Sequence, residues 1–223
     1  MIAHLLLPVG VRPPYQVVVV FPGSSAIEAR SSASMDLRRT DFIVKSGRAL
    51  MFPIYKHTYE RGGALHSDYP NETTFYKDAV VMWEKDLARS IDYLESRKDI
   101  DGKRLGYYGV SWGGALGRIM PAVEKRIRAN VLYVAGLSFQ RALPEVDVMN
   151  YVTRVKQPTL MLNGELDFYF PAATSQRAMF ELLGAPPEHK KRLGYPGGHS
   201  VPRTEMIKQT LEWLDRYLGP VGQ

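Results

Sequence analysis

The sequence contains no cysteine among its 223 residues. Disulfides, thiolate metal ligands and a cysteine nucleophile are therefore excluded together. The chain also lacks an apolar run that approaches the roughly 20 residues of a membrane-spanning helix, so we expect no such helix. Residues 1–8 lack the basic stretch of a secretory signal. We therefore expect a cytoplasmic protein.

A long basic stripe is missing as well. Lys and Arg exceed Asp and Glu by only six, 29 against 23, and the basic clusters at 38–39, 125–128 and 190–192 are short and dispersed. A nucleic-acid surface usually has a longer stripe with aromatic residues between the charges, so we expect no nucleic-acid partner. We see no repeat, low-complexity tract or Ser/Gly linker. With 45% apolar and 23% charged residues, the composition is that of a globular protein, and we expect one domain over residues 1–223.

The residues that are present form two alternating apolar patterns. Short continuous runs such as Tyr15–Phe21 are rich in β-branched residues, which is typical of strands buried on both faces. Between these runs, apolar residues recur at helical spacing. The predicted strands are 15–21, 49–54, 105–110, 129–135, 159–162 and one near 193, and the predicted helices are 75–97, 113–123, 172–183 and 204–218. This alternation predicts an α/β fold with a mostly parallel sheet and helices on both faces. In such sheets ligands bind at the carboxyl ends of the strands.

The segment Gly109-Val-Ser111-Trp-Gly113 matches the pattern G-x-S-x-G and lies between a predicted strand and a predicted helix. A serine on a tight strand-to-helix turn projects its hydroxyl above the sheet edge, and small neighbours allow that turn to close. The following helix also directs its positive N-terminal end toward a developing oxyanion. We therefore predict that Ser111 is a nucleophile. The alternative is a glycine-rich turn without chemistry.

A serine hydroxyl needs a general base, and the base needs an acid that orients it. On this scaffold the chain order is Ser, then Asp or Glu, then His. His199 lies in a glycine-rich turn directly before the last predicted helix, whereas His189 lies in what looks like an exposed loop. We predict that His199 is the base, with a surface-loop histidine as the alternative.

The orienting acid is predicted to follow a strand at its carboxyl end. Asp167 comes soon after the predicted strand 159–162, and this position favours it. Glu165 lies in the same loop and is the rival, while Asp147 is a third choice. Each of these residues could also be an ordinary acidic turn residue.

An oxyanion hole needs two backbone N–H donors directed at the developing charge. One is predicted to be the N–H of Trp112, which follows the nucleophile. We expect the other to come from Ser24, because Gly23 allows the loop after the strand 15–21 to approach closely. The alternatives are a simple turn or a small-residue phosphate nest. The loop lacks the lysine of a P-loop, which argues against nucleotide binding.

Four motifs in chain order resemble those of α/β-hydrolases: Phe21-Pro-Gly-Ser-Ser25, Gly109-Val-Ser-Trp-Gly-Gly114, Asn163-Gly-Glu-Leu-Asp-Phe-Tyr-Phe-Pro171 and Gly197-Gly-His-Ser200. The branch to which the chain is most similar is that of dienelactone-hydrolase-like and prolyl-oligopeptidase-like serine hydrolases. Segments 33–45 and 59–86 more closely resemble hydrolase segments at the C-terminal end of some bacterial serine/threonine kinase polypeptides. The resemblance covers nearly the whole chain.

This resemblance implies an α/β-hydrolase fold with Ser111 as nucleophile, Asp167 as acid and His199 as base, and with Ser24 and Trp112 as oxyanion donors. Residues 2–7 resemble a late strand of the usual amino-terminal hairpin, which implies a shortened N-terminus. The sheet edge exposed there would favour a homodimer or would mark a fragment of a longer protein. Dienelactone hydrolases proper use cysteine as nucleophile, so we do not expect that activity.

Only about twenty residues separate 135 from 158, where relatives often insert a helical cap, and we expect a minimal cap or none. Aromatic and apolar residues in this stretch and after Asp167 suggest an open acyl pocket. The residues predicted to bind substrate are Phe139, Met149, Phe168, Tyr169 and Phe170, with Leu143 and Tyr151 beside them. The alternative is that these side chains pack in the core or at its rim.

The sequence therefore predicts a serine carboxylesterase that acts on small-molecule esters of short to medium chain length, with no metal and no organic cofactor. A peptidase or amidase with the same triad is one alternative. A non-catalytic regulatory module of hydrolase descent is another. Tyr55, Lys56 and residues 59–61 follow a predicted strand and either shape the pocket or hold a loop.

Overall fold

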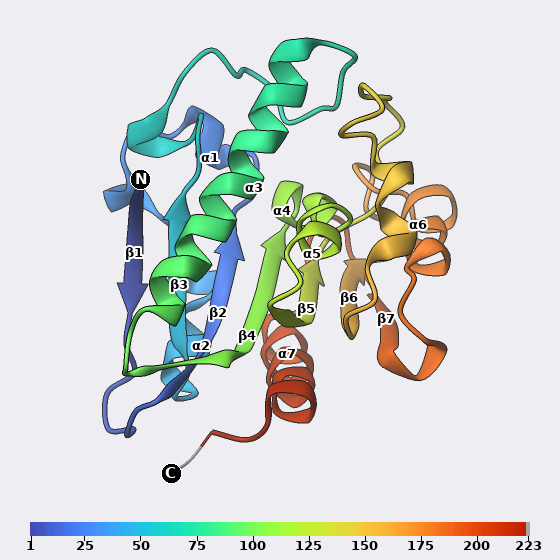
Figure 1. Cartoon of the computed structure of the whole chain (residues 1–223). Helices are drawn as coiled ribbons and strands as arrows, with labels where there is room; N and C mark the ends of the chain where they lie inside the picture. Colours follow the sequence, from blue (N-terminus) through green and yellow to red (C-terminus); the bar gives the residue numbers. More distant parts are fainter. Residues whose placement is uncertain (222–223) are drawn as a thin grey trace.

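The computed structural model describes residues 1–221, and its centre is one sheet. Within these residues the sheet has seven strands in the order β1-β3-β2-β4-β5-β6-β7 (Figure 1). The strands are β1 (Ile2–Leu6), β2 (Tyr15–Phe21), β3 (Ala49–Ile54), β4 (Ile100–Val110), β5 (Ile127–Tyr133), β6 (Thr159–Gly164) and β7 (Lys190–Tyr195). β1 pairs antiparallel with β3, and every other pairing is parallel. The predicted parallel-rich sheet is confirmed. It is open, with β1 and β7 at its edges.

The continuous apolar run of β2 is buried on both faces of the sheet. Val17 and Val19 belong to one hydrophobic cluster, while Val18 and Val20 belong to the other. Because successive side chains of a strand point to opposite faces, this alternation requires a layer of structure on each side.

Helices supply those two layers (Figure 1). One face is covered by α3 (Thr74–Glu95), α4 (Trp112–Leu116), α5 (Met120–Val123) and α6 (Arg177–Leu182), and the other by α2 (Asp41–Lys45) and α7 (Arg203–Leu218). The short α1 (Ser25–Glu28) directly follows the loop after β2. The predicted helix 75–97 corresponds to α3. It starts where the Thr73 side chain accepts a hydrogen bond from the Tyr76 N–H, and it buries Trp83 and Leu87 completely.

Two elements differ most from the sequence prediction. β4 begins at Ile100 rather than near 105, because Tyr15 of β2 pairs with Ile100 before the register shifts. The predicted helix 113–123 is interrupted between Leu116 and Met120, so that two short helices replace it. Pro121 stands in the first turn of α5, where its missing N–H costs no helical hydrogen bond, and a proline there starts a new helix.

The connection from β5 to β6 contains two single 3₁₀ turns, Val148–Asn150 and Val152–Arg154. The predicted minimal cap agrees with this connection. Throughout residues 1–221, no helix has both the length and the hydrophobicity needed to cross a membrane.

Candidate active site

The chain turns sharply at Ser111, between β4 and α4. The backbone of Ser111 lies at φ 52° and ψ −105°, a conformation that residues with a side chain rarely adopt. Its N–H donates a hydrogen bond of 2.9 Å to the Tyr133 carbonyl of β5, and its carbonyl accepts one of 2.7 Å from the Ala115 N–H. Val134, directly after β5, also has a positive φ of 47°. Backbone strain is therefore concentrated at this end of the sheet.

The glycines around Ser111 are required by close backbone contacts. A Cβ on Gly109 would lie 2.3 Å from the Gly113 carbonyl oxygen, and a Cβ on Gly113 would lie 2.2 Å from the Phe21 carbonyl oxygen. Tyr107 adds a hydrogen bond of 2.7 Å from its hydroxyl to the Gly113 carbonyl. These contacts bring the turn tightly onto β2 and explain the two glycines of the G-x-S-x-G pattern.

Three side chains from three different loops meet above the carboxyl ends of the strands. Ser111 Oγ lies 2.8 Å from His199 Nε2, and His199 Nδ1 lies 2.7 Å from Asp167 Oδ2. The Asp167 side chain is fully buried, whereas that of His199 is 21% exposed. A carboxylate accepts the Nδ1–H, so the Nε2 atom of a neutral imidazole is left as an acceptor for the serine hydroxyl.

The loop after β6 holds the Asp167 carboxylate in place. Asp167 Oδ1 accepts backbone N–H bonds from Tyr169 at 2.9 Å and Phe170 at 3.2 Å. The buried side chain of Gln176 donates to the carbonyls of Gly164 and Phe170, both at 2.8 Å. The two ends of the loop are thus fixed around the acid, with Oδ2 directed at His199.

The rival residues of the sequence analysis have other partners. Glu165 accepts a hydrogen bond of 2.8 Å from Arg192. Asp147 accepts the Met149 N–H at 2.9 Å and caps a 3₁₀ turn. His189 pairs with the Tyr217 hydroxyl at 3.1 Å. The structure therefore does not bring these three side chains to Ser111.

Ser24 and Trp112 lie beside Ser111 at two helix starts. Trp112 is the first residue of α4 and Ser24 directly precedes α1, so neither backbone N–H has an acceptor within its own helix. A Cβ built on Gly23 would lie 3.6 Å from the Ser111 Cβ, which shows how closely the loop after β2 approaches the serine. Their role as oxyanion donors stays a prediction.

A cavity of about 450 Å³ opens at this point. Ser111, His199, Ser24 and Trp112 line it. Its wall combines aromatic side chains with a few polar ones, and it is large enough for a small organic substrate. In the described part of the chain, no group of three or more His, Asp or Glu residues is placed to hold a metal ion.

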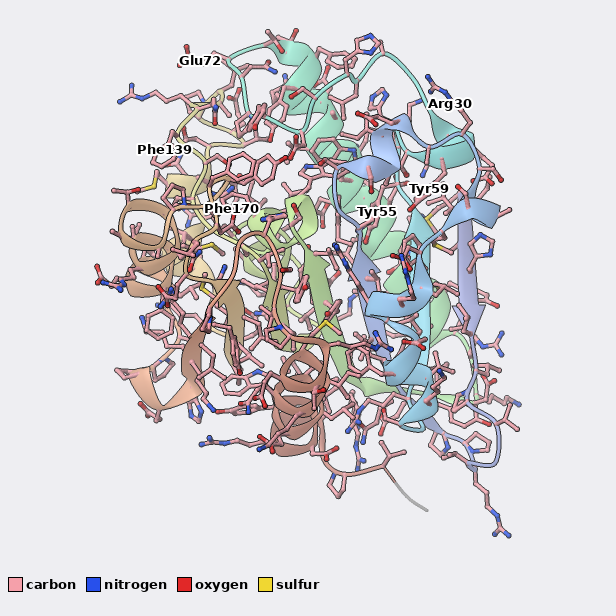
Figure 2. The ribbon with its side chains drawn as sticks, turned by 180° about the vertical axis from the view of Figure 1, so that it is seen from behind. Arg30, Tyr55, Tyr59, Glu72, Phe139 and Phe170 are labelled. Carbon is pink, nitrogen blue, oxygen red and sulfur yellow. The ribbon has the colours of Figure 1, made fainter. Side chains whose placement is uncertain are left out.

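Four of the five predicted substrate-binding residues line the cavity: Phe139, Phe168, Tyr169 and Phe170. Phe170 is nearly buried, and Figure 2 shows it on the same side of the molecule as Phe139. Phe139, Phe168 and Tyr169 are more than half exposed, so they form an apolar rim. Met149 is exposed in the turn at 148–150 and is not among the residues that line the cavity, so its contact with substrate stays a prediction.

Sequence reasoning missed several polar residues of the cavity wall. Asp68 lies in the irregular segment before α3, and burial raises its pKa, partly opposed by a backbone hydrogen bond. Tyr76 of α3 is the second of these polar wall residues, and burial raises the pKa of its hydroxyl as well. Arg118 lies in the break between α4 and α5, and its side chain is buried. The helical spacing of apolar residues marks Tyr76 as a core residue of α3 and not as a residue of the cavity wall. No periodic pattern marks Asp68 or Arg118.

Hydrogen bonds to α3 fix the loop at 55–61, which follows β3. Asp86 of α3 accepts the Lys56 N–H at 2.8 Å and the Arg61 guanidinium at 2.6 Å, and Arg61 also donates to the Ile54 carbonyl at 2.7 Å. The indole N–H of Trp83 donates to the Lys56 carbonyl at 2.8 Å. This network, rather than the cavity, accounts for these residues.

Solved structures with the same fold include TT1662 from Thermus thermophilus, with a TM-score of 0.72, 17% identity, and coverage of 97% of this chain and 93% of that one. A protein assigned as a dienelactone hydrolase from Klebsiella pneumoniae has a TM-score of 0.73 and 17% identity, with coverage of 96% and 92%. A cold-adapted esterase from an Arctic intertidal metagenomic library has a TM-score of 0.61 and 20% identity, with coverage of 97% and 87%. A search of curated proteins found no match.

The sheet, the strained serine turn and these structural relatives define an α/β-hydrolase fold. Residues 42–211 match the family described as "Serine hydrolase (FSH1)". The chain therefore belongs to the FSH1 serine hydrolase family. The resemblance to hydrolase segments of kinase polypeptides stays a prediction.

Proposed function

We propose that this serine hydrolase is a carboxylesterase acting on esters of short to medium chain length. The observation that carries the proposal is the unbroken hydrogen-bonded series Asp167–His199–Ser111 at the wall of an open, aromatic-rimmed cavity. In this proposal Ser111 is the nucleophile, His199 the general base and Asp167 the acid that orients it.

The reaction runs in two steps. His199 Nε2 takes the proton of Ser111 as its Oγ attacks the ester carbonyl carbon. The backbone N–H groups of Trp112 and Ser24 stabilise the resulting oxyanion. His199 then gives the proton to the leaving alkoxide oxygen, and an acyl-enzyme remains. Water, deprotonated by His199, attacks the acyl carbonyl, and His199 returns the proton to Ser111 Oγ as the bond to the acyl carbon breaks and the acid leaves.

Asp167 acts through His199. Its Oδ2 fixes the imidazole with Nδ1 protonated and stabilises the positive charge that develops during attack. Because its other oxygen is held by two backbone N–H groups, the carboxylate keeps its orientation throughout the cycle.

The first experiment measures hydrolysis of a series of p-nitrophenyl esters from acetate to dodecanoate. We expect wild-type turnover to be highest on the shorter chains, and Ser111→Ala to lose several orders of magnitude with its fold intact. Full activity in Ser111→Ala would refute the mechanism. Matched amides test the peptidase alternative, and stoichiometric labelling of Ser111 by a fluorophosphonate tests the non-catalytic one.

The identity of the acid is tested by a matched pair. Asp167→Asn should lower kcat by about 10³- to 10⁴-fold, because an amide no longer fixes the reactive tautomer. Glu165→Gln, two residues away and paired with Arg192, should change kcat by less than about tenfold. Equal losses would contradict the assignment.

The acyl pocket is tested in the same way. Phe168→Ser should raise KM for butyrate and hexanoate esters, because the side chain contributes apolar surface at the cavity rim. Met149→Ser serves as the control, since both side chains are exposed but Met149 lies outside the cavity.

A location in the cytoplasm, independence from cofactors and nucleic acid, and pairing of two copies stay predictions.

A further inference from the structure

Arg118 belongs to the cavity wall, and its guanidinium is incompletely hydrogen-bonded. The residue is 1% exposed, yet it is among those that line the cavity. Its Nε donates to the Ala115 carbonyl at 2.5 Å and its Nη2 donates to Ser138 Oγ at 3.2 Å. Its Nη1 is buried and has no hydrogen-bond partner. A buried N–H group without a partner is uncommon and unfavourable, and each such group calls for an explanation.

The positive charge of Arg118 is also uncompensated. Across residues 1–221, every ion pair within 4.0 Å involves other side chains. Tyr76 and Asp147 are the groups whose fields favour the charged form. The hydrogen bonds of the guanidinium go to Ala115 and Ser138 instead. Burial lowers the pKa of Arg118 to about 10, so the side chain stays charged at neutral pH. Buried arginines are normally paired with an anion.

Arg118 follows Ser111 by seven residues, and its guanidinium lies close to this proposed nucleophile. The Ala115 N–H donates to the Ser111 carbonyl, so these two residues are one helical turn apart, roughly 6 Å along the axis. The guanidinium contacts the far end of that turn through the Ala115 carbonyl. A substrate held by Ser111 would therefore reach Arg118 with a group several atoms away from its ester carbonyl.

We propose that Arg118 is a specificity-determining residue that receives a carboxylate of the substrate, so that the natural ester is the half-ester of a dicarboxylic acid or another ester bearing one carboxylate. This inference rests on the proposed esterase function. Nη1 supplies the free donors, and the carboxylate supplies the missing counter-charge. A single negative charge fits better than a phosphate dianion, because the Asp68 carboxylate lines the same cavity and repels excess negative charge.

The test compares two esters of equal length, monoethyl adipate and ethyl hexanoate, which differ by a carboxylate in place of a methyl group. For the wild type, kcat/KM should be about 10- to 100-fold higher on the half-ester, the range for one hydrogen bond to a charged group. Arg118→Met should remove this preference, and Arg118→Lys should retain part of it. Asp68→Asn should increase it. 4-Acetoxybenzoate and p-tolyl acetate repeat the comparison with the carboxylate on the alcohol side.

Arg39→Met is the matched control. Arg39 also lines the cavity, but its side chain is exposed, so its charge is screened by water and salt. Its loss should change the preference by less than about threefold. A wild-type ratio near one in both ester pairs, or equal losses on charged and neutral esters in Arg118→Met, would overturn the proposal.

Binding of adipate separates this inference from the esterase assignment, because binding requires no turnover. Adipate should raise the Tm of wild type and of Ser111→Ala, but not that of Arg118→Met. If the fluorophosphonate fails to label Ser111 while adipate still stabilises the protein through Arg118, then the esterase function fails and the anion site stands. If labelling succeeds and adipate has no effect, the anion site fails.

Discussion

The strained backbone of Ser111 predicts that glycine at this position gives a more stable protein than alanine. At φ 52° and ψ −105°, a Cβ atom is held close to the backbone, and both serine and alanine carry one. Glycine removes it. Since Ser111→Gly and Ser111→Ala both lose the hydrogen bond to His199, the difference between the two variants isolates the backbone term.

The magnitude follows from two opposing contributions. Strain at a non-glycine residue in such a region costs about 1–3 kcal/mol. Glycine loses more conformational freedom on folding, which costs about 0.5–1 kcal/mol. Ser111→Gly should therefore be more stable than Ser111→Ala by about 1 kcal/mol, which corresponds to a Tm difference of about 2–4 °C for a chain of this size.

Equilibrium unfolding in urea measures this difference through the midpoints at a shared m-value. Ser96, the C-cap of α3, is the control, because its φ of −75° and ψ of −11° suit any residue. There glycine should be less stable than alanine by about 0.4–1 kcal/mol, because glycine has more conformational freedom to lose on folding. If glycine were also less stable than alanine at position 111, the turn would store no strain and the reasoning would be refuted.

Three further predictions follow from the fold and the site. Ser24→Pro removes a backbone N–H at a φ of −62° that proline tolerates, so kcat should fall by about 10²- to 10³-fold while Ser24→Ala stays near wild type in the same ester assay. Gly113→Ala places a Cβ 2.2 Å from a carbonyl oxygen and should prevent folding, whereas Gly198→Ala, with open space around it, should give a normal circular dichroism spectrum and Tm. Burial raises the pKa of Tyr59 to about 12, so the folded state binds its proton more tightly than the unfolded state does, and the free energy of unfolding should fall as the pH rises from about 10 towards 12. Tyr59→Phe should weaken that dependence in urea titrations at several pH values.

Much of the fold could be predicted because the sheet is parallel and doubly covered. Strands buried on both faces need continuous apolar runs, and β2 reads as one in the sequence. The amino-terminal part of β4 could not be predicted, because residues 101–104 are polar and the pairing of Tyr15 with Ile100 is a tertiary effect. The break after Leu116 was missed because a local apolar pattern continued through it.

The residues of the site also fall into those that the sequence could predict and those that it could not. Ser111, Asp167 and His199 could be predicted from strand ends and small neighbours, and the structure brings them within hydrogen-bond distance. Asp68 and Arg118 could not, because a polar residue in an irregular segment does not indicate which cavity it will face. Met149 was predicted from its place in the apolar stretch between 135 and 158, and the structure leaves it exposed in a 3₁₀ turn that Asp147 caps.

The hydrogen bond between Ser111 and His199 joins residues that are 88 positions apart in the chain. During synthesis or refolding, the nucleophile therefore remains without its base until residue 199 has been added and the loop after β7 has docked. Trp83 and Trp112 are buried in the core of the earlier strands. Trp213 lies in α7, beyond His199, and is therefore replaced in this test. In Trp213→Phe, whose remaining tryptophans are Trp83 and Trp112, recovery of fluorophosphonate labelling after dilution from urea should lag behind recovery of tryptophan fluorescence, so that reactivity of the serine reports the docking of the loop that carries its base.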